Sequence, residues 1–561
     1  MINARLDSLE FIGGTKIGMN EDSVVVIVGP NNSGKSSVLT AIKDLLAGQE
    51  AKSSSLTTLS LLRMTTLEEI EASLADVLNA SGSYGLPKFG FHKFQLKSWW
   101  DSENFVIGPF LTSQLVCELT TRSRLADCDP SPSVDVRNPY KLAHPFQKMY
   151  RDESLEERTS GIFRTAFKRD LIIHRGAGSV IPVYVGQRPK IESGEDRVSI
   201  SHLERIEALD KIELQGDGIR SFASIISRVI TESRPIQLID EPEAFLPPPQ
   251  ARLVARSILE ESSHRQTVIA THSSDVLRGL LSSDTSRVSV VRLMRPSGSA
   301  LAYHLDATQI AELWRDPILR FSNVLDGLFH DGVILTEADA DCRFYEALSF
   351  ASISDADRPD IHYSYTGGKD RLPVVIKALV ALKVPVATIV DFDVLNNDQP
   401  LRKIVEAYGG SWESIADDWN IVKKAVEENK AFTDGDRFRD LVLKELQNYE
   451  KNTAVPKTTL KAIEKLTKSA SPWGQVKSSG IAAIPTGVPT VAANQLLQTL
   501  KKMGIFVAPK GEMEGFCRSI GGHGPRWVSE VMANKSLAND DELGAARTYV
   551  EEVNSYLRGK S

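Results

Sequence analysis

The sequence predicts an α/β protein made of two successive α/β domains, each organised around a largely parallel sheet. At 561 residues the chain is several times longer than a typical domain, so separate hydrophobic cores are expected. Short apolar runs alternate with segments of helical periodicity from residue 216, and a second alternation of the same kind begins at residue 332. Strands that alternate with helices pair in parallel, because each helix carries the chain back to the same edge of the sheet.

Composition indicates a soluble globular protein. Hydrophobic residues make up 42% and charged residues 25%, and a net charge of −7 argues against a protein coated in basic residues. No run of eighteen apolar residues and no secretion signal occur, which predicts a cytoplasmic protein without a membrane segment. The four cysteines contain no CxxC pair, so neither disulfides nor a zinc site is expected and all four are predicted to be buried: Cys117, Cys128, Cys342 and Cys517.

The first predicted domain begins with strand 22–28, a glycine-rich loop and helix 36–46. Residues 51–160 contain Ser/Thr-rich stretches, one helix near 65–79 and a Pro/Gly/aromatic segment, and we interpret them as a mostly helical insertion with a possible role in dimerisation. The domain therefore comprises residues 1–50 and 161–306, followed by a linker at 307–331. Its later elements are helix 219–231, strand 236–239, helix 249–263, strand 267–270, helix 274–281 and strand 287–293.

The second predicted domain covers residues 332–520 and contains a Lys/Glu-rich helical insertion at 400–500. A helical tail is expected at 521–561. The elements expected before and after the insertion are strand 332–336, helix 339–350, strand 361–365, helix 371–382, strand 385–390 and strand 505–508.

A phosphate-binding loop lies between the first strand and its helix. Residues 29–36 fit G-x-x-x-x-G-K-[ST], and the order strand, loop, helix is the one that the mechanism of this motif requires. Backbone N–H groups of such a loop surround phosphates, Lys35 reaches the terminal phosphates and Ser36 ligates Mg²⁺. The residues expected to bind ATP here are Gly29, Asn31, Asn32, Ser33, Gly34, Lys35, Ser36 and Ser37.

Two acids follow the strand 236–239. Asp240 is placed to hold Mg²⁺, and Glu241 to position or deprotonate the attacking water. His272 follows strand 267–270 and is placed to contact the terminal phosphate. On its own such a histidine is usually structural, but its order after the other two motifs favours a functional role.

The order of these motifs resembles an ABC-type ATPase of the RecF/SMC kind, in which two heads sandwich ATP. The resemblance implies a signature segment at residues 214–218, where Gly216 and Gly218 would contact the nucleotide of the second head. This segment lacks the serine of the usual LSGGQ, and an ordinary turn before a helix is the alternative. The glutamine of the Q-loop is not identified.

Carboxylates also follow two strands of the second domain. Glu337 ends strand 332–336 with Asp341 four residues later, and Asp391 and Asp393 follow strand 385–390. Loops at the carboxyl ends of neighbouring parallel strands converge, so these oxygens are predicted to hold one or two divalent cations. A lone D-x-D is more often a solvated turn, and two strand-end acids in order favour the metal site.

The segments ILTEADAD and IVDFDVLNN resemble the TOPRIM fold, and an ABC ATPase followed by TOPRIM resembles the OLD (overcoming lysogenization defect) family of ATP-dependent endonucleases. The K-G-x-x-E element of such nucleases matches Lys510 to Glu514, which implies a transition-state contact for Lys510 and a metal-ligand role for Glu514; an exposed loop is the alternative. The resemblance implies dimers or higher oligomers, dependence on Mg²⁺ or Mn²⁺, defence against phage, and a partner such as a helicase-like protein or a reverse transcriptase with its RNA/DNA product. TEADADCRFYE and YTGGKDRLP resemble the retron-associated branch.

Two lysine- and arginine-rich segments are candidates for binding nucleic acid, expected to be DNA. Lys457, Lys461, Lys465 and Lys468 share one helical face, which is equally typical of a solvated surface, and the second segment contains Arg164, Lys168, Arg169 and Arg175. The predicted function is an ATP-dependent, metal-dependent DNA endonuclease. The alternatives are a nucleotide-dependent sensor with an inactive TOPRIM domain and a ribonuclease that acts on RNA such as tRNA.

Overall fold

The computed structural model describes residues 2–51, 55–86, 89–101, 107–133, 142–176, 178–295, 301–317, 323–354, 358–428, 435–447, 454–470 and 472–560. The chain divides into two compact units, a first unit of residues 1–320 and a second unit of residues 321–561. Among the described residues no helix is long and apolar enough to cross a membrane. All four cysteines are buried and free, as the sequence predicts.

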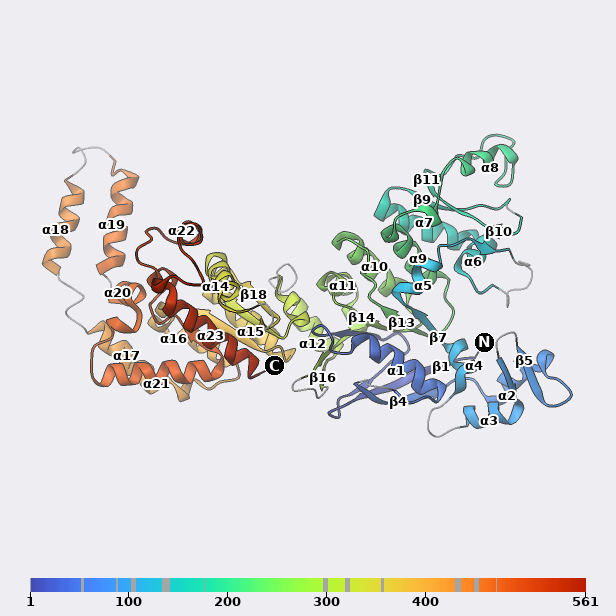
Figure 1. Ribbon diagram of the computed structural model, residues 1–561, viewed down its shortest axis with the longest axis horizontal. Coiled ribbons are helices and arrows are strands. Elements are labelled where there is room, and N and C mark those ends of the chain that lie inside the picture. The colour runs from blue at the N-terminus through green and yellow to red at the C-terminus, as the bar shows by residue number, and fades with distance from the viewer. Residues whose placement is uncertain are drawn as a thin grey trace. The chain divides into compact units, whose positions relative to one another are not determined.

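The first unit is built on a six-stranded sheet whose strands are, in chain order, β3 (Val24–Val28), β7 (Val116–Leu119), β13 (Ile236–Asp240), β14 (Gln266–Ala270), β15 (Val288–Met294) and β16 (Leu301–Leu305). Their order across the sheet is β16-β15-β3-β14-β13-β7. Figure 1 labels β7, β13, β14 and β16 of this sheet. Five strands are parallel, and only the edge strand β16 is antiparallel to its neighbour. The carboxyl ends of β3, β13 and β14 therefore lie together.

A second, antiparallel sheet of order β2-β1-β4 joins the same hydrophobic core. Its strands are β1 (Ala4–Phe11), β2 (Lys16–Gly18) and β4 (Leu56–Arg63). The helices and the hairpin in this part of the unit are α1 (Lys35–Ala47), α2 (Leu67–Ser73), β5 (Ser83–Leu86), β6 (Phe89–His92), α3 (Lys93–Trp100), α4 (Gly108–Leu115), α5 (Thr121–Ala126), α9 (Asp217–Thr231), α10 (Pro248–Glu261), α11 (Ser274–Leu280) and α12 (Ala307–Trp314).

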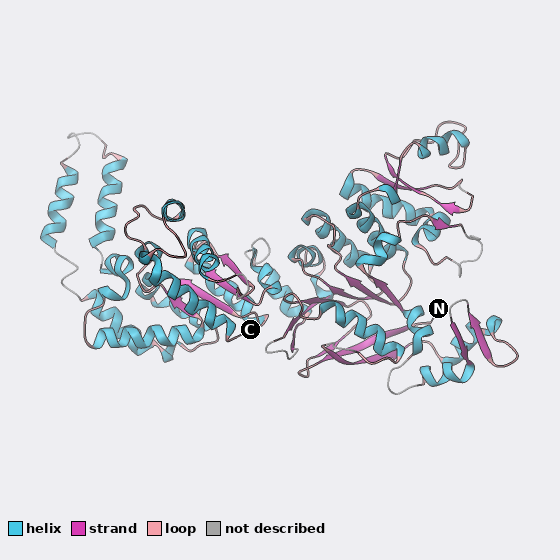
Figure 2. Ribbon diagram, in the orientation of Figure 1, coloured by secondary structure: helices cyan, strands magenta, loops and turns pink. Residues whose placement is uncertain are grey.

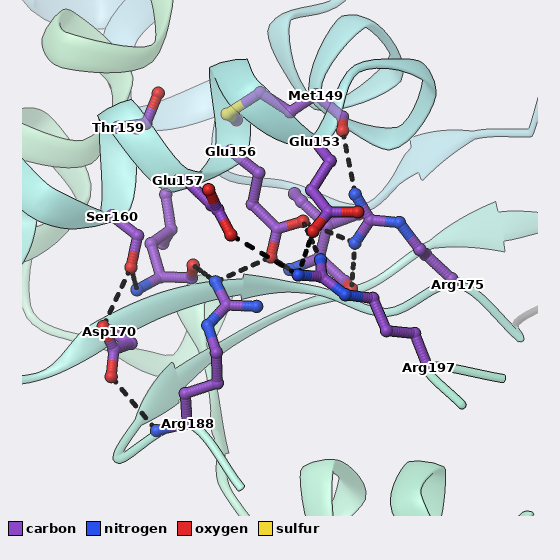
Figure 3. Close-up of polar contacts among 12 residues, drawn as sticks. Met149, Glu153, Glu156, Glu157, Thr159, Ser160, Asp170, Arg175, Arg188 and Arg197 are labelled. Atoms are coloured by element: carbon purple, nitrogen blue, oxygen red, sulfur yellow. Dashed lines mark hydrogen bonds and ion pairs between the residues drawn. The ribbon is translucent and has the colours of Figure 1, made fainter. Parts of the chain in front are cut away.

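Residues 131–211 add small antiparallel sheets and helices beside α9. They contain β8 (Ser131–Pro132), α6 (Pro145–Arg151), α7 (Glu153–Phe167), β9 (Asp170–Ile173), β10 (Val180–Ile181), β11 (Val183–Gly186), α8 (Ile200–Glu207) and β12 (Asp210–Lys211). Figure 3 shows how Arg175, Arg188 and Arg197 converge on Glu156 of α7, whose side chain is 1% exposed. The distance from Arg188 Nη2 to Glu156 Oε1 is 2.8 Å. These ion pairs join α7 to the strands, because a buried carboxylate is stable only when it is paired.

The second unit is built on a parallel sheet of order β18-β17-β19-β20, with β17 (Gly332–Thr336), β18 (Ile361–Tyr365), β19 (Val386–Val390) and β20 (Ile505–Val507). Figure 2 shows helices around these strands. The helices are α14 (Asp339–Ser352), α15 (Leu372–Ala381), α16 (Asp398–Ala407), α17 (Ala416–Glu427), α18 (Gly435–Leu446), α19 (Lys457–Ala470), α20 (Pro472–Ser479), α21 (Val488–Met503), α22 (Pro525–Asn534) and α23 (Gly544–Arg558). The segment between β19 and β20 is thus a series of helices, as the sequence predicts.

Three expected boundaries differ from the structure. The range 51–160, expected to be an insertion, supplies β4 and β7, which pair with β1 and β13 of the two sheets of the first unit. Both strands lie among Ser/Thr-rich and polar residues, and both pair with strands that are distant along the chain. The expected linker 307–331 contains α12, which packs on β15. The expected tail 521–561 contributes Trp527 and Tyr549 to the core of the second unit.

Candidate functional site

The phosphate-binding loop has the backbone geometry that an anion site needs. Helix α1 begins at Lys35, so its first N–H groups point toward the loop. Gly29 has φ +146°, and a Cβ there would lie 2.3 Å from the carbonyl oxygen of Leu293. Only glycine fits at this position. Ser37 Oγ donates to the carbonyl of Gly34, whereas Asn31 and Asn32 are exposed.

Lys35 is held inside this loop. Its Nζ donates to the carbonyl oxygens of Gly29 at 2.8 Å and Pro30 at 2.7 Å, and the residue is 3% exposed. Burial lowers the pKa of Lys35 to about 8, although the nearby Glu241, Glu243 and Asp240 act in the opposite direction. The hydroxyl of Ser33 is buried and has no hydrogen-bond partner among the described residues. A buried ammonium and an unpaired donor fit the polyphosphate of ATP.

The magnesium ligands expected at this site meet directly. Ser36 Oγ donates to Asp240 Oδ1 at 2.8 Å. Burial raises the pKa of Asp240 and Glu241 adds to this effect, while the hydrogen bond from Ser36 lowers it. The Nε2 of His272 lies 3.5 Å from Glu241 Oε1. The structure therefore brings together Lys35 and the other predicted groups at the ends of β3, β13 and β14.

Sequence reasoning missed Arg124 of α5, which supports the end of β13. Its side chain is fully buried, and its guanidinium donates to the carbonyl oxygens of Asp240 at 2.7 Å and Glu241 at 3.0 Å. Glu241 has φ +46°, a strained value for a residue with a side chain. Arg124 precedes these partners by more than a hundred residues in a range expected to be an insertion, so no local pattern could reveal it.

Glu243 supports the neighbouring loop that carries His272. Its Oε1 accepts hydrogen bonds from Thr271 Oγ1 at 2.9 Å and from the backbone N–H of His272 at 2.7 Å. Glu243 is the last residue of the D-E-P-E segment, but its partners after β14 follow only from the pairing of β13 with β14. It fixes the backbone from which His272 extends.

The segment expected to contact a second head forms the start of α9. Gly216 is the N-cap residue of this helix. A Cβ at Gly218 would lie 2.7 Å from the carbonyl oxygen of Phe245. Both glycines thus have a local structural role, and their contact with a partner nucleotide stays a prediction.

The acidic centre of the second unit forms where β17 and β19 end side by side. Glu337 follows β17, whereas Asp391 and Asp393 follow β19, its parallel neighbour. Burial raises the pKa of Glu337 to about 7, and repulsion from Asp391 and Asp393 adds to it. The Oε1 atom of Glu337 is buried and has no hydrogen-bond partner among the described residues.

Asp341 and the loop after β20 complete this centre. Burial, and then the charge of Asp391, raise the pKa of Asp341 to about 7. The pKa of Glu512 also rises to about 7, through burial and then repulsion from Glu514. His523 Nδ1 lies 2.6 Å from Glu514 Oε1, and candidate ligand atoms of Glu512, Glu514 and His523 all lie within 4.8 Å of one another. Crowded carboxylates with an unpaired oxygen fit divalent cations, which take oxygen ligands.

The lysines at the acidic centre are not the one that the sequence predicts. Lys510 is exposed and forms no ion pair within the described ranges. Lys477 of α20 instead places its Nζ 3.0 Å from Asp391 Oδ2 and 3.3 Å from Asp393 Oδ2. Lys369 lies 3.4 Å from the other oxygen of Asp393. Glu512, His523, Lys369 and Lys477 were all missed: Glu512 fills a variable position of the K-G-x-x-E element, and the other three belong to no motif with a metal-binding spacing.

The two basic segments that the sequence offers for binding nucleic acid differ in their surroundings. Arg164 pairs with Asp170 and Arg175 with buried Glu156, so these two side chains stabilise the fold. Lys457 and Lys461 are exposed on α19. The side chains of Lys465 and Lys468 lie outside the described residues.

Comparison with known proteins identifies one domain in each unit. Residues 328–393 match the TOPRIM domain of overcoming lysogenization defect protein-like sequences, and residues 12–74 match an AAA domain. The first match contains β17, β19 and the acids that follow them, and the second contains the phosphate loop. The chain therefore carries an ATPase domain and an OLD-like TOPRIM domain, which imply binding of nucleotide and divalent metal. No curated protein matches the chain.

Solved structures similar to the chain include ATPase heads. An SMC head bound to the C-terminal winged-helix domain of ScpA has 14% identity and a TM-score of 0.35, covering 55% of this chain and 99% of that one. The SMC head domain from Thermotoga maritima has 14% identity and a TM-score of 0.28, with 54% and 99% covered. The ADP form of an ATP-binding cassette of an ABC transporter has 14% identity and a TM-score of 0.27, with 57% and 97% covered. The first unit itself is an α/β ATPase fold in which the phosphate loop joins β3 of a mostly parallel sheet to α1.

Proposed function

We propose that this protein is an ATP-hydrolysing, divalent-metal-dependent endonuclease that cleaves DNA phosphodiester bonds. The observation that carries the proposal is the acidic centre at the ends of β17, β19 and β20, inside a domain that matches OLD-like TOPRIM. Three of its carboxyls have pKa values raised to about 7 by burial and then by mutual repulsion, which bound cations would relieve. A complete phosphate-binding loop in the same chain adds nucleotide dependence.

The acids of this centre are numerous enough to hold two cations. Glu337, Asp391 and Asp393 would hold one Mg²⁺, and Asp341, Glu512 and Glu514 a second, with Mn²⁺ as a substitute. When bound, such ions activate water and stabilise the leaving oxygen of a phosphodiester. Lys369 and Lys477 supply positive charge beside the carboxylates, where the phosphate backbone would enter.

Residues of the first unit would carry out ATP hydrolysis. Lys35 is placed to bind the terminal phosphates in exchange for its two backbone carbonyls, and Ser36 and Asp240 to hold Mg²⁺. Glu241 would orient and deprotonate the attacking water, with His272 beside it. Because Gly216 and Gly218 begin α9, closure of two heads around ATP would bring a helix N-terminus to the partner's nucleotide. We propose that this closed dimer controls cleavage.

The role in defence against phage, and a reverse transcriptase with its RNA/DNA product as partner, are proposals that rest on the family resemblance alone. They concern the signal that starts cleavage, whereas the chemistry proposed above depends on the two sites.

Incubation of the purified chain with supercoiled DNA, single-stranded DNA and RNA, with Mg²⁺ or Mn²⁺ and with or without ATP, tests the nuclease directly. Cleavage should disappear in Asp391→Ala while ATP binding persists, and Asp417→Ala, an exposed acid on α17, is the matched control. Cleavage that survives in Asp391→Ala would refute the site. Preferential cleavage of RNA would show that the protein is a ribonuclease and not a DNA endonuclease. Absence of cleavage of every substrate would favour a sensor with an inactive TOPRIM domain.

A further inference from the structure

Lys477 occupies the middle of the acidic centre. Its ammonium lies within 3.0 Å of Asp391 and 3.3 Å of Asp393, and 4.0 Å from Glu512 Oε2. It therefore contacts acids from two different segments, the end of β19 and the loop after β20. Lys369, in contrast, forms an ion pair within the described part of the chain with Asp393 alone, at 3.4 Å.

The backbone around Lys477 is fixed by close contact with the loop that carries Glu512. Gly511 has φ +101°, and a Cβ there would lie 2.0 Å from the carbonyl oxygen of Lys477. The N–H of Ile481, just after α20, donates to the carbonyl of Pro509 at 3.2 Å, and the N–H of Phe392 donates to that of Gly511 at 2.7 Å. These contacts join α20, the end of β19 and the loop after β20 into one arrangement. The position of Lys477 is thus a property of the fold.

The ammonium of Lys477 faces the carboxylate oxygens of both aspartates directly. Its Nζ lies 3.0 Å from Asp391 Oδ2 and donates a hydrogen bond to Asp393 Oδ2 at 3.3 Å. An ammonium surrounded by carboxylate oxygens satisfies the charge that a divalent cation would otherwise satisfy. The ammonium of Lys477 and a divalent cation would thus use the same oxygen atoms of Asp391 and Asp393.

We propose that Lys477 is a resident counter-cation of the nuclease site, that a divalent metal binds only by displacing its ammonium, and that the displaced ammonium then contacts the phosphate of the nucleic acid. The helical segment between β19 and β20 would thus deliver a functional group to the site through α20. The inference rests on the metal site of the proposed function, and its first measurement does not require any cleavage.

Titration of the full chain with Mn²⁺ in the absence of nucleotide tests whether the metal displaces the ammonium of Lys477. Binding is measured as the loss of the electron paramagnetic resonance signal of free Mn²⁺. In Lys477→Met the affinity should rise by about tenfold or more, because the competing charge is gone. Lys369→Met is the matched control for simple loss of positive charge beside the same acids, and its increase should be clearly smaller. Equal increases in the two variants, or unchanged or weaker binding in Lys477→Met, would refute displacement.

A second variant moves Lys477 without altering it. Gly511→Ala should push the backbone of Lys477 away and raise the Mn²⁺ affinity toward that of Lys477→Met, while Gly409→Ala is the control, since Gly409 also has a positive φ (+78°) but nothing within 4 Å of its Cβ position. Unchanged affinity in Gly511→Ala, with a native circular dichroism spectrum, would contradict the proposed geometry.

Cleavage at saturating Mn²⁺ tests the second half of the inference. The rate of cleavage should fall by about tenfold or more in Lys477→Met despite tighter metal binding. A wild-type rate in this variant would refute the phosphate contact. If wild type cleaves nothing while Lys477→Met still binds Mn²⁺ more tightly, the proposed function fails and the exchange stands.

Discussion

Replacing Glu337 with glutamine should stabilise the metal-free protein, although it removes a predicted metal ligand. The pKa of Glu337 rises from its ordinary value of 4.5 to about 7 in the folded chain. Between these values the folded state keeps a proton that the unfolded state has lost, so stability falls as pH rises through this window. At about 1.4 kcal/mol per pH unit, the raised pKa destabilises the folded state by about 1 kcal/mol at pH 5.5 and about 3 kcal/mol above pH 7. The glutamine side chain would avoid this cost, since an amide has no charge to bury.

Urea denaturation of the second unit in EDTA, at pH 5.5 and pH 8, measures the difference. The free energy of unfolding of Glu337→Gln should exceed that of wild type by about 1 kcal/mol at pH 5.5 and about 3 kcal/mol at pH 8. Added Mg²⁺ should stabilise wild type more than the variant. Glu428→Gln, at an exposed position on the same unit, is the control and should change nothing. Equal stability of Glu337→Gln and wild type at pH 8 would refute the electrostatic account of the acidic centre.

Three further outcomes follow from other contacts. Arg124→Met should leave ATP binding intact but lower the ATPase kcat by about tenfold or more, because Glu241 loses its backbone support; Arg122→Met, exposed on the same helix, is the control, and equal rates in the two variants would contradict this role. His523→Gln should weaken binding of Co²⁺ by about tenfold and that of Mg²⁺ much less, since imidazole favours the transition metal; an unchanged visible spectrum of bound Co²⁺ would exclude His523 as a ligand. Binding of ATP at pH 8.5 should take up protons, because the phosphates restore the charge of Lys35, whose pKa is about 8; calorimetry in two buffers should show less uptake at pH 7, and equal uptake at both values would contradict the burial of this ammonium.

Local patterns in the sequence predicted much of the fold correctly. The strand 332–336 and the strand 361–365 have the predicted bounds, because short runs rich in β-branched or aromatic residues between turns have few alternatives. The phosphate loop and the acids after β13 were placed correctly for the same reason, since each motif is continuous in sequence. The strands β4 and β7 were missed, as their pairing depends on β1 and β13, which lie far away along the chain.

By itself the sequence determined which chemistry the chain offers: a phosphate loop, strand-end carboxylates and the order of two α/β domains. Only the tertiary structure decided which cations face those carboxylates. It placed Lys477 between Asp391 and Asp393 and left Lys510, the motif lysine, exposed. Parallel pairing determines which strand ends meet, whereas the choice of lysine depends on how α20 packs against the loop at Gly511. That packing is a contact between backbones, and the spacing of side chains along a sequence carries no record of it.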